Sequence, residues 1–205
     1  MRIPCLQQAG SCTTKNNKFK QMKMKYAFTI VGLLILHAAF GQTEKYFTRN
    51  AVITFTSEAP METIISSNKS SNCILSTQTN DIAFKVVIKS FEFEKQAMQD
   101  HFNKDYLQSD KYPNATFDGK INTVLDYKKN GKYDVVVDGK LTIHGISNPV
   151  KQSGTIEISN GKVTVKSKFS IKLSDYGIKV PNDYLKKISN SVAIDINAVL
   201  APYVR

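Results

Sequence analysis

The sequence predicts an all-β protein, an antiparallel barrel of about eight strands with a short helical insertion. From Tyr46 onward, apolar and polar residues alternate along most of the chain, as they do in strands with one buried face. Two Asn-Gly pairs lie between alternating segments, and Asn-Gly favours the tight turns of antiparallel hairpins. The 205 residues carry no Gly/Ser-rich linker, so we expect one main domain.

Each predicted strand is justified by a period of two. In the clearest case Val163, Val165 and Phe169 share one face, while Lys166 and Lys168 lie on the other. Such alternation indicates one buried and one solvent-exposed face per strand. The strands predicted on this pattern are 51–56, 82–88, 115–123, 133–143, 156–158, 163–173 and 192–200.

Turn residues punctuate these strands. Asn-Gly supplies the positive φ that two-residue hairpin turns require, so hairpins are predicted at Asn130-Gly131 and Asn160-Gly161. Asn80-Asp81 predicts a third turn with weaker support. The segment 145–149, Gly-Ile-Ser-Asn-Pro, is predicted to break the chain after the strand that ends near residue 143.

Two segments do not alternate cleanly. Residues 94–107 are rich in helix formers, and Met98 and Phe102 lie four apart, so a short helix is expected there. Residues 57–78 are ambiguous. They are interpreted as two short strands, 61–65 and 73–77, that are separated by a polar loop over 66–72.

The strand pattern suits either a sandwich or a closed barrel. The last strand, 192–200, is long and apolar at alternate positions. An exposed edge of that kind invites aggregation, which favours a barrel that pairs its first and last strands. Eight strands enclose an interior that is filled by side chains or holds one small ligand.

Residues 1–41 differ from the rest. They carry six basic residues and no acidic one, and an apolar run begins at Tyr26 and ends in Ala38-Ala39-Phe40-Gly41. This is typical of a signal peptide, with its core at 24–41, and the run is shorter than the ~20 residues of a membrane span. A buried N-terminal helix is the alternative. Removal would leave 42–205 as the barrel domain, exported to the periplasm or secreted in soluble form; the true start is Met1, Met22 or Met24.

The export segment changes what the charge means. The whole chain has a formal net charge of +11, which by itself would indicate a nucleic-acid or anionic partner. Residues 42–205 have 22 basic and 17 acidic residues, a net charge of +5, so no nucleic-acid partner is expected. Cys73 is the one cysteine of that part and has no internal partner for a disulfide.

No catalytic or metal-binding pattern stands out. His101 and His144 are the two histidines of 42–205, and neither has a Cys or carboxylate at ligand spacing, whereas zinc needs three or four such ligands. No nucleophile elbow or phosphate loop occurs, so we expect neither an enzyme nor a cofactor. The lysines at 162, 166, 168 and 172 are interpreted as a solvated face, with phosphate steering as the alternative.

Three motifs resemble those of the YceI-like family of lipid- and polyisoprenoid-binding proteins. Residues 101–117 read HFNKDYLQSDKYPNATF and resemble the family's H…L…YP.A.F signature. Residues 139–150 begin GKLTIHG and end in Pro149-Val150, like its G.LT.HG…PV hairpin. Residues 174–178, SDYGI, resemble its DYGI element. The segment 57–80 is shorter than in most of the family, which indicates a compact branch.

The resemblance implies a lipocalin-like barrel whose apolar lumen carries an isoprenoid-like lipid or a quinone, with transient membrane contact. His101 would be the contact to the ligand's polar headgroup. The residues themselves leave a packed core open, and with it a structural or interaction module filled by its own side chains. The candidate lumen residues are Ile53, Phe55, Phe84, Val86, Ile88, Phe117, Ile121, Val135, Val137, Leu141, Val163, Val165, Phe169, Ile171, Ile194 and Ile196.

Overall fold

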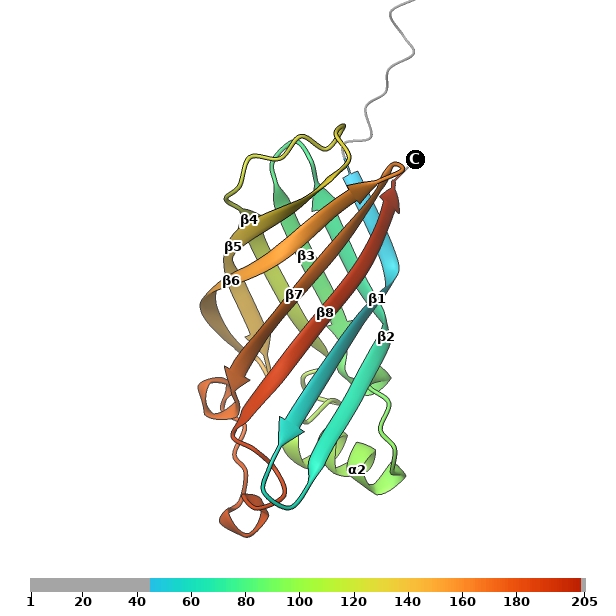
Figure 1. The fold of residues 1–205 in the computed structure, drawn as a ribbon. Coiled ribbons are helices and arrows are strands. Elements are labelled where there is room, and N and C mark those ends of the chain that lie inside the picture. Colours follow the sequence, from blue (N-terminus) through green and yellow to red (C-terminus); the bar gives the residue numbers. More distant parts are fainter. Residues whose placement is uncertain (1–44, 204–205) are drawn as a thin grey trace, which may run out of the picture. The chain divides into compact units, whose positions relative to one another are not determined.

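A computed structural model describes residues 45–203, which form a closed antiparallel barrel of eight strands (Figure 1). The predicted fold class is therefore confirmed. The strands are β1 (Lys45–Glu58), β2 (Thr63–Ser76), β3 (Asp81–Val87), β4 (Asn114–Ile121), β5 (Gly131–Ile143), β6 (Ile146–Ser159), β7 (Lys162–Lys172) and β8 (Ser191–Pro202). The predicted leader, 1–41, lies outside the described residues.

Each strand pairs with the next along the chain, and β8 closes the barrel on β1. In that closing pair Ile53 lies opposite Ile196 and Phe55 lies opposite Ile194. All four are apolar residues that the alternation predicted to face inward. Pairing the last strand removes the exposed edge that its sequence would otherwise leave.

The up-and-down order places the connections at two ends of the barrel. At one end lie the β1–β2 hairpin, the long segment 88–113 between β3 and β4, the β5–β6 turn and the segment 173–190 between β7 and β8. At the other end lie the β2–β3, β4–β5 and β6–β7 connections. We call these the insertion end and the opposite end.

β2 is one continuous strand, so the predicted polar loop over 66–72 is wrong. Its inward polar residues are buried because they meet partners from distant segments. Ser66 Oγ donates to the Glu92 carbonyl at 2.8 Å, and Asn68 Nδ2 donates to the Val87 carbonyl at 2.9 Å. Asn68 Oδ1 in turn accepts from Ser71 Oγ at 3.1 Å. Satisfied groups of this kind remain buried at little cost.

The two Asn-Gly pairs behave differently. Asn160 and Gly161 have φ values of 50° and 72°, and they join β6 to β7 as predicted. Gly131 instead begins β5, while β4 has already ended at Ile121. Residues 122–130 therefore form a longer connection, and the hairpin predicted at Asn130-Gly131 is wrong.

A turn that the sequence did not predict joins β5 to β6. His144 and Gly145 have φ values of 52° and 77°, and β6 begins at once with Ile146. The predicted chain break over 145–149 is therefore wrong. Pro149 fits inside β6 because that part of β6 pairs only with β5, and proline is tolerated on such an edge.

The helical insertion is confirmed. α2 (Gln96–His101) continues into the π-helical turn η2 (Phe102–Tyr106), within the predicted 94–107. Short 3₁₀ turns complete the fold: η1 (Ile88–Ser90), η3 (Leu173–Tyr176) and η4 (Asn182–Tyr184). Within residues 45–203, no helix is both long enough and apolar enough to cross a bilayer.

Candidate functional site

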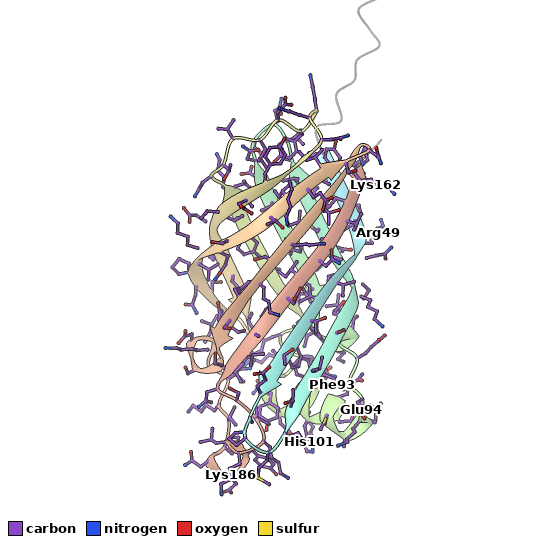
Figure 2. The ribbon with its side chains drawn as sticks, in the orientation of Figure 1. Arg49, Phe93, Glu94, His101, Lys162 and Lys186 are labelled. Carbon is purple, nitrogen blue, oxygen red and sulfur yellow. The ribbon has the colours of Figure 1, made fainter. Side chains whose placement is uncertain are left out.

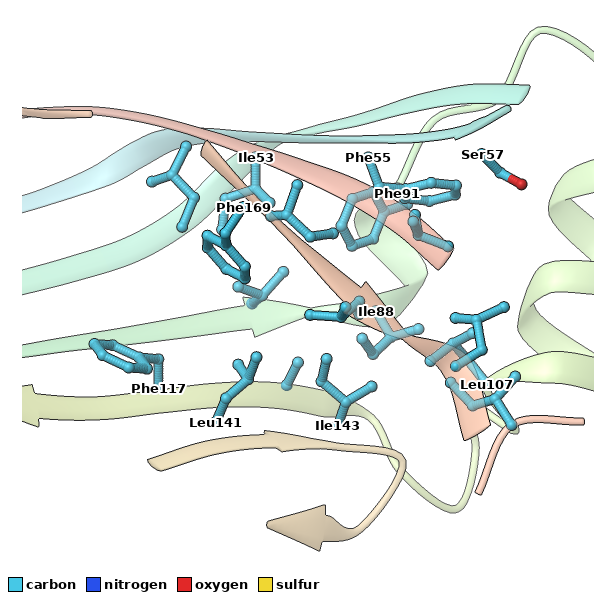
Figure 3. Close-up of a pocket in the computed structure, with 18 of the residues that line it drawn as sticks. Ile53, Phe55, Ser57, Ile88, Phe91, Leu107, Phe117, Leu141, Ile143 and Phe169 are labelled. Atoms are coloured by element: carbon cyan, nitrogen blue, oxygen red, sulfur yellow. The ribbon is translucent and has the colours of Figure 1, made fainter. Parts of the chain in front are cut away.

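The barrel contains an apolar cavity of about 640 Å³. It runs from the middle of the barrel to the insertion end, where exposed residues of α2, η2 and 179–188 border it. Figure 3 shows apolar side chains from several strands converging on it. Fourteen of the sixteen predicted lumen residues line the cavity: Ile53, Phe55, Phe84, Val86, Ile88, Phe117, Val135, Val137, Leu141, Val165, Phe169, Ile171, Ile194 and Ile196.

The other two predicted lumen residues do not line the cavity. Ile121 is 2% exposed and Val163 is 0% exposed, and both pack in the core near the opposite end. There the connection 122–130 contributes Leu125 and Tyr127 to the same cluster. These side chains fill the barrel, so the interior is a packed core at one end and a cavity at the other.

The insertion adds aromatic rings that the strand pattern did not predict. Phe91, Phe93 and Phe102 line the cavity and surround Phe55 of β1, with ring centroids 5.5–5.7 Å from its ring. Figure 3 shows Phe55 and Phe91 side by side. The Phe91-x-Phe93 spacing was the available signal, because two phenylalanines beside a non-alternating segment indicate a buried face.

The segment that carries these rings is tied to the barrel wall. Ser67 of β2 and Glu92 bond to each other through both backbone amides, at 3.0 and 3.4 Å. At the other end of the insertion, the Ile88 amide donates to the Pro113 carbonyl at 2.9 Å. The aromatic rings therefore have a fixed support on the wall.

The wall divides between β6 and β7. Their pairing runs from Ser159↔Lys162 to Gly154↔Ser167 and goes no further. Beyond that point β6 pairs only with β5, and β7 pairs only with β8. Residues on both separated edges line the cavity, including Val150, Gln152, Phe169 and Ile171. The cavity thus borders a lateral split, where Gln152 adds an amide to the apolar wall.

The carboxylates at the mouth of the cavity already have cationic partners. Glu62 Oε1 lies 3.8 Å from Lys95 Nζ. Asp105 Oδ2 lies 2.6 Å from His101 Nδ1, and the His101 side chain is 68% exposed. His101 therefore borders the cavity as predicted, but it points its ring nitrogen at a carboxylate of its own helical segment.

Two lysines at the mouth are unpaired. Lys179 and Lys187 line the cavity, and within residues 45–203 neither lies within 4.0 Å of a carboxylate oxygen. Both are exposed. The polar groups available to a ligand are thus concentrated at the mouth, while the deeper wall is mainly apolar.

His144 serves the β5–β6 turn. Its Nδ1 donates to the Tyr176 carbonyl at 3.2 Å, and its ring meets the Tyr112 ring edge-on at 4.6 Å. Its Nε2 is buried and has no hydrogen-bond partner among the described residues. No group of three potential metal-ligating side chains is present in 45–203.

Two further sequence observations fall outside the cavity chemistry. Cys73 is buried on the inner side of β2, and burial raises the pKa of its thiol, so it is inert rather than nucleophilic. The lysines at 162, 166, 168 and 172 are all exposed, with Lys168 Nζ 3.8 Å from Asp195 Oδ2. Lys166 also borders the cavity, beside the lateral split.

A family model described as the YceI-like domain matches residues 31–200. A polyisoprenoid-binding domain from Saccharophagus degradans has 14% sequence identity and a TM-score of 0.67, over 79% of this chain and 100% of that chain. BcnA of Burkholderia cenocepacia has 19% identity and a TM-score of 0.61, over 74% and 96%. The YCEI protein of Campylobacter jejuni has 19% identity and a TM-score of 0.56, over 68% and 85%. No curated protein sequence matches the chain.

Proposed function

The chain belongs to the YceI-like domain family, and on that premise we propose that its barrel binds an isoprenoid-like or other amphiphilic lipid. The observation that carries the proposal is the cavity itself, about 640 Å³ of mainly apolar space that reaches the insertion end. Small-molecule sites are typically ~300–1,000 Å³, largely apolar, and equipped with a few polar groups. This cavity fits that description.

The distribution of polar groups gives the ligand a direction. Burial of an apolar chain contributes ~25 cal/mol per Å² of surface removed from water, which requires no polar contact deep in the barrel. The unpaired Lys179 and Lys187, the exposed His101 and the Gln152 amide line the mouth and the lateral split. The lipid's chain would therefore lie inside, with its headgroup at the mouth.

The role we propose is that of a non-enzymatic carrier, and a quinone with an isoprenoid tail is one ligand that fits it. A carrier collects and delivers its ligand at a membrane, so transient membrane contact belongs to the proposal. The polyisoprenoid-binding domain from Saccharophagus degradans shares this fold. The alternative, a structural module filled by its own side chains, describes only the end where Ile121 and Val163 pack.

Native mass spectrometry of the purified protein tests the proposal. We expect a co-purifying apolar mass, or after delipidation the uptake of an added polyprenol or quinone. Phe169→Glu should abolish it, because the side chain lines the cavity and a carboxylate there loses solvation. Lys168→Glu, one residue away on the exposed face, should retain it. Protein that holds no lipid under either condition would overturn the proposal.

We also propose that the protein is exported and that residues 1–41 are removed. The support is the sequence pattern of that segment, a basic stretch followed by an apolar run and small residues. The intact mass of the product from an exporting host tests this. A chain that begins at Gln42 is expected, and a product that retains residues 26–40 would contradict the proposal.

A further inference from the structure

Large apolar side chains are exposed next to the cavity mouth. Met61 in the β1–β2 hairpin is 66% exposed, and Ile65 at the start of β2 is 57% exposed. In the segment between β7 and β8, Tyr184 is 49% exposed and Leu185 is 38% exposed. Exposed apolar groups gathered on one surface indicate an interaction site more strongly than scattered ones.

These side chains belong to one continuous surface. The Met61 amide donates to the Lys186 carbonyl at 2.9 Å, which joins the β1–β2 hairpin to the segment that carries Tyr184 and Leu185. The Ser189 amide donates to Ser57 Oγ, also at 2.9 Å. Figure 1 shows the two connections side by side at the insertion end.

The same surface carries unpaired positive charge. Residues 179–190 contain three lysines, Lys179, Lys186 and Lys187, and one acidic residue, Asp183. All three lysines are exposed, and none has a carboxylate within 4.0 Å among residues 45–203. The acidic Glu94 lies on the other flank, beside α2 (Figure 2). The charge at this end is therefore polarised toward 179–190.

We propose that this surface is a docking site for anionic phospholipid bilayers. The docking rim comprises the apolar side chains of Met61, Ile65, Tyr184 and Leu185 and the ammonium groups of Lys179, Lys186 and Lys187. Apolar side chains that enter the boundary between headgroups and acyl chains, beside lysines that meet anionic headgroups, are the usual elements of interfacial binding.

The rim encircles part of the cavity mouth, which gives docking a purpose. Tyr184 and Lys187 line the cavity and also belong to the rim. A bilayer held by the rim would therefore face the opening through which a lipid chain enters. The inference rests on the proposed lipid-carrier function in its purpose, although the docking itself is a separate property of the surface.

Vesicle sedimentation tests the docking. The probes are large unilamellar vesicles of phosphatidylcholine, alone and mixed with phosphatidylglycerol. We expect binding to the mixed vesicles that weakens as salt is added, because screening reduces attraction between exposed charges. All variants carry the same N-terminal segment as the wild type, so any binding by that segment is a common background.

The rim variants and their controls differ only in position. Lys186→Glu should weaken binding to mixed vesicles about fivefold or more, since one basic residue near an anionic surface contributes roughly that factor. The double variant Met61→Ser/Leu185→Ser should weaken binding to both kinds of vesicle. The controls are Lys162→Glu and Val124→Ser at the opposite end (Figure 2 labels Lys162), where Val124 is 93% exposed; they should bind as the wild type does.

The outcomes separate docking from lipid carriage. Thermal unfolding confirms that each variant is folded, which we expect because the substituted side chains are exposed. If rim and control variants bind vesicles equally, the docking rim is wrong, even where native mass spectrometry finds a bound lipid. If the rim variants lose vesicle binding but the protein never holds a lipid, docking stands and the carrier function fails.

Discussion

The ring of Phe102, from the helical insertion, stacks on the ring of Phe55, from β1, with centroids 5.5 Å apart and planes inclined by 17°. This pair joins the one helical part of the barrel domain to the strand that closes the barrel. Both rings also line the cavity. The contact therefore links the stability of the insertion to the shape of the cavity near its mouth.

A double-mutant cycle of Phe55→Leu and Phe102→Leu should show coupling of ~0.5–1.5 kcal/mol in the free energy of unfolding, as for other aromatic pairs. Urea denaturation measures it. The single variants should also weaken lipid uptake. As a control, Phe47→Leu disrupts the Phe47–Tyr203 pair, whose centroids lie 6.1 Å apart at the opposite end, and should leave uptake unchanged. Strictly additive single effects would show that the stack carries no energy of its own.

Two turn glycines form a matched pair for a second prediction. Gly145 and Gly161 have φ values of 77° and 72°, so alanine is strained at both by about 1–2 kcal/mol. A Cβ at Gly145 would lie 2.5 Å from the Tyr112 ring, whereas one at Gly161 would meet nothing within 4 Å. Gly145→Ala should therefore cost more unfolding free energy than Gly161→Ala, as measured by urea denaturation. Equal costs would mean that the Tyr112 ring moves aside freely.

The sequence could predict strands, their inward faces and closure, because alternation reports directly which side of each strand is buried. It could not separate the two Asn-Gly pairs. Asn160-Gly161 joins strands that pair up to the turn, so local preference decides its conformation. The other pair ends a connection whose Leu125 is buried and whose Tyr127 hydroxyl donates to Asn80 Oδ1 at 3.1 Å. Such distant contacts override the local preference of a dipeptide.

The candidate site was predictable to a similar extent. Alternation identified inward residues but could not distinguish those at the cavity from those in the packed core, because Ile121 and Ile194 are alike in sequence. The difference arises from what lies opposite each residue, which depends on the connection 122–130 and on the split between β6 and β7. The rings of Phe91 and Phe102 were missed because their segment does not alternate.

Tyr127 gives a third prediction, on alkaline stability. Burial, with a smaller contribution from Tyr46, raises the pKa of Tyr127 to about 12. The unfolded phenol ionises near pH ~10, so the stability that Tyr127 contributes is complete below that pH and is lost as pH rises toward 12. Tyr127→Phe should flatten this alkaline decline in urea titrations, while Tyr203→Phe should not. Burial also raises the pKa values of Tyr106 and Tyr176, so part of the decline should persist.

Cys73 gives a fourth prediction. The thiol is 1% exposed and its pKa is raised by burial, so a thiol reagent at mildly alkaline pH should label it only in unfolded molecules. The labelled fraction should follow the urea unfolding curve. Cys73→Ser should lower the free energy of unfolding by ~1–3 kcal/mol, since a hydroxyl replaces an apolar group, yet the protein should still fold. Rapid labelling of the native protein would show that β2 opens locally.

The last prediction compares two isoleucines, one in the packed core and one at the cavity. Ile121→Ala should lower the free energy of unfolding by ~2–5 kcal/mol, because it removes packed atoms and leaves a new void. Ile194 lines the existing cavity and is only half-buried, so Ile194→Ala deletes fewer contacts and should cost less. The order should reverse for lipid affinity, which should fall for Ile194→Ala and stay unchanged for Ile121→Ala.

Urea denaturation of the delipidated protein and titration with a polyprenol measure the two quantities. Delipidation matters, because a bound ligand stabilises the folded state and would inflate the apparent cost of Ile194→Ala. A protein whose barrel is simply packed would show similar stability losses for both variants and no effect on affinity from either. That result would assign the cavity walls to the hydrophobic core and leave the barrel without a ligand site.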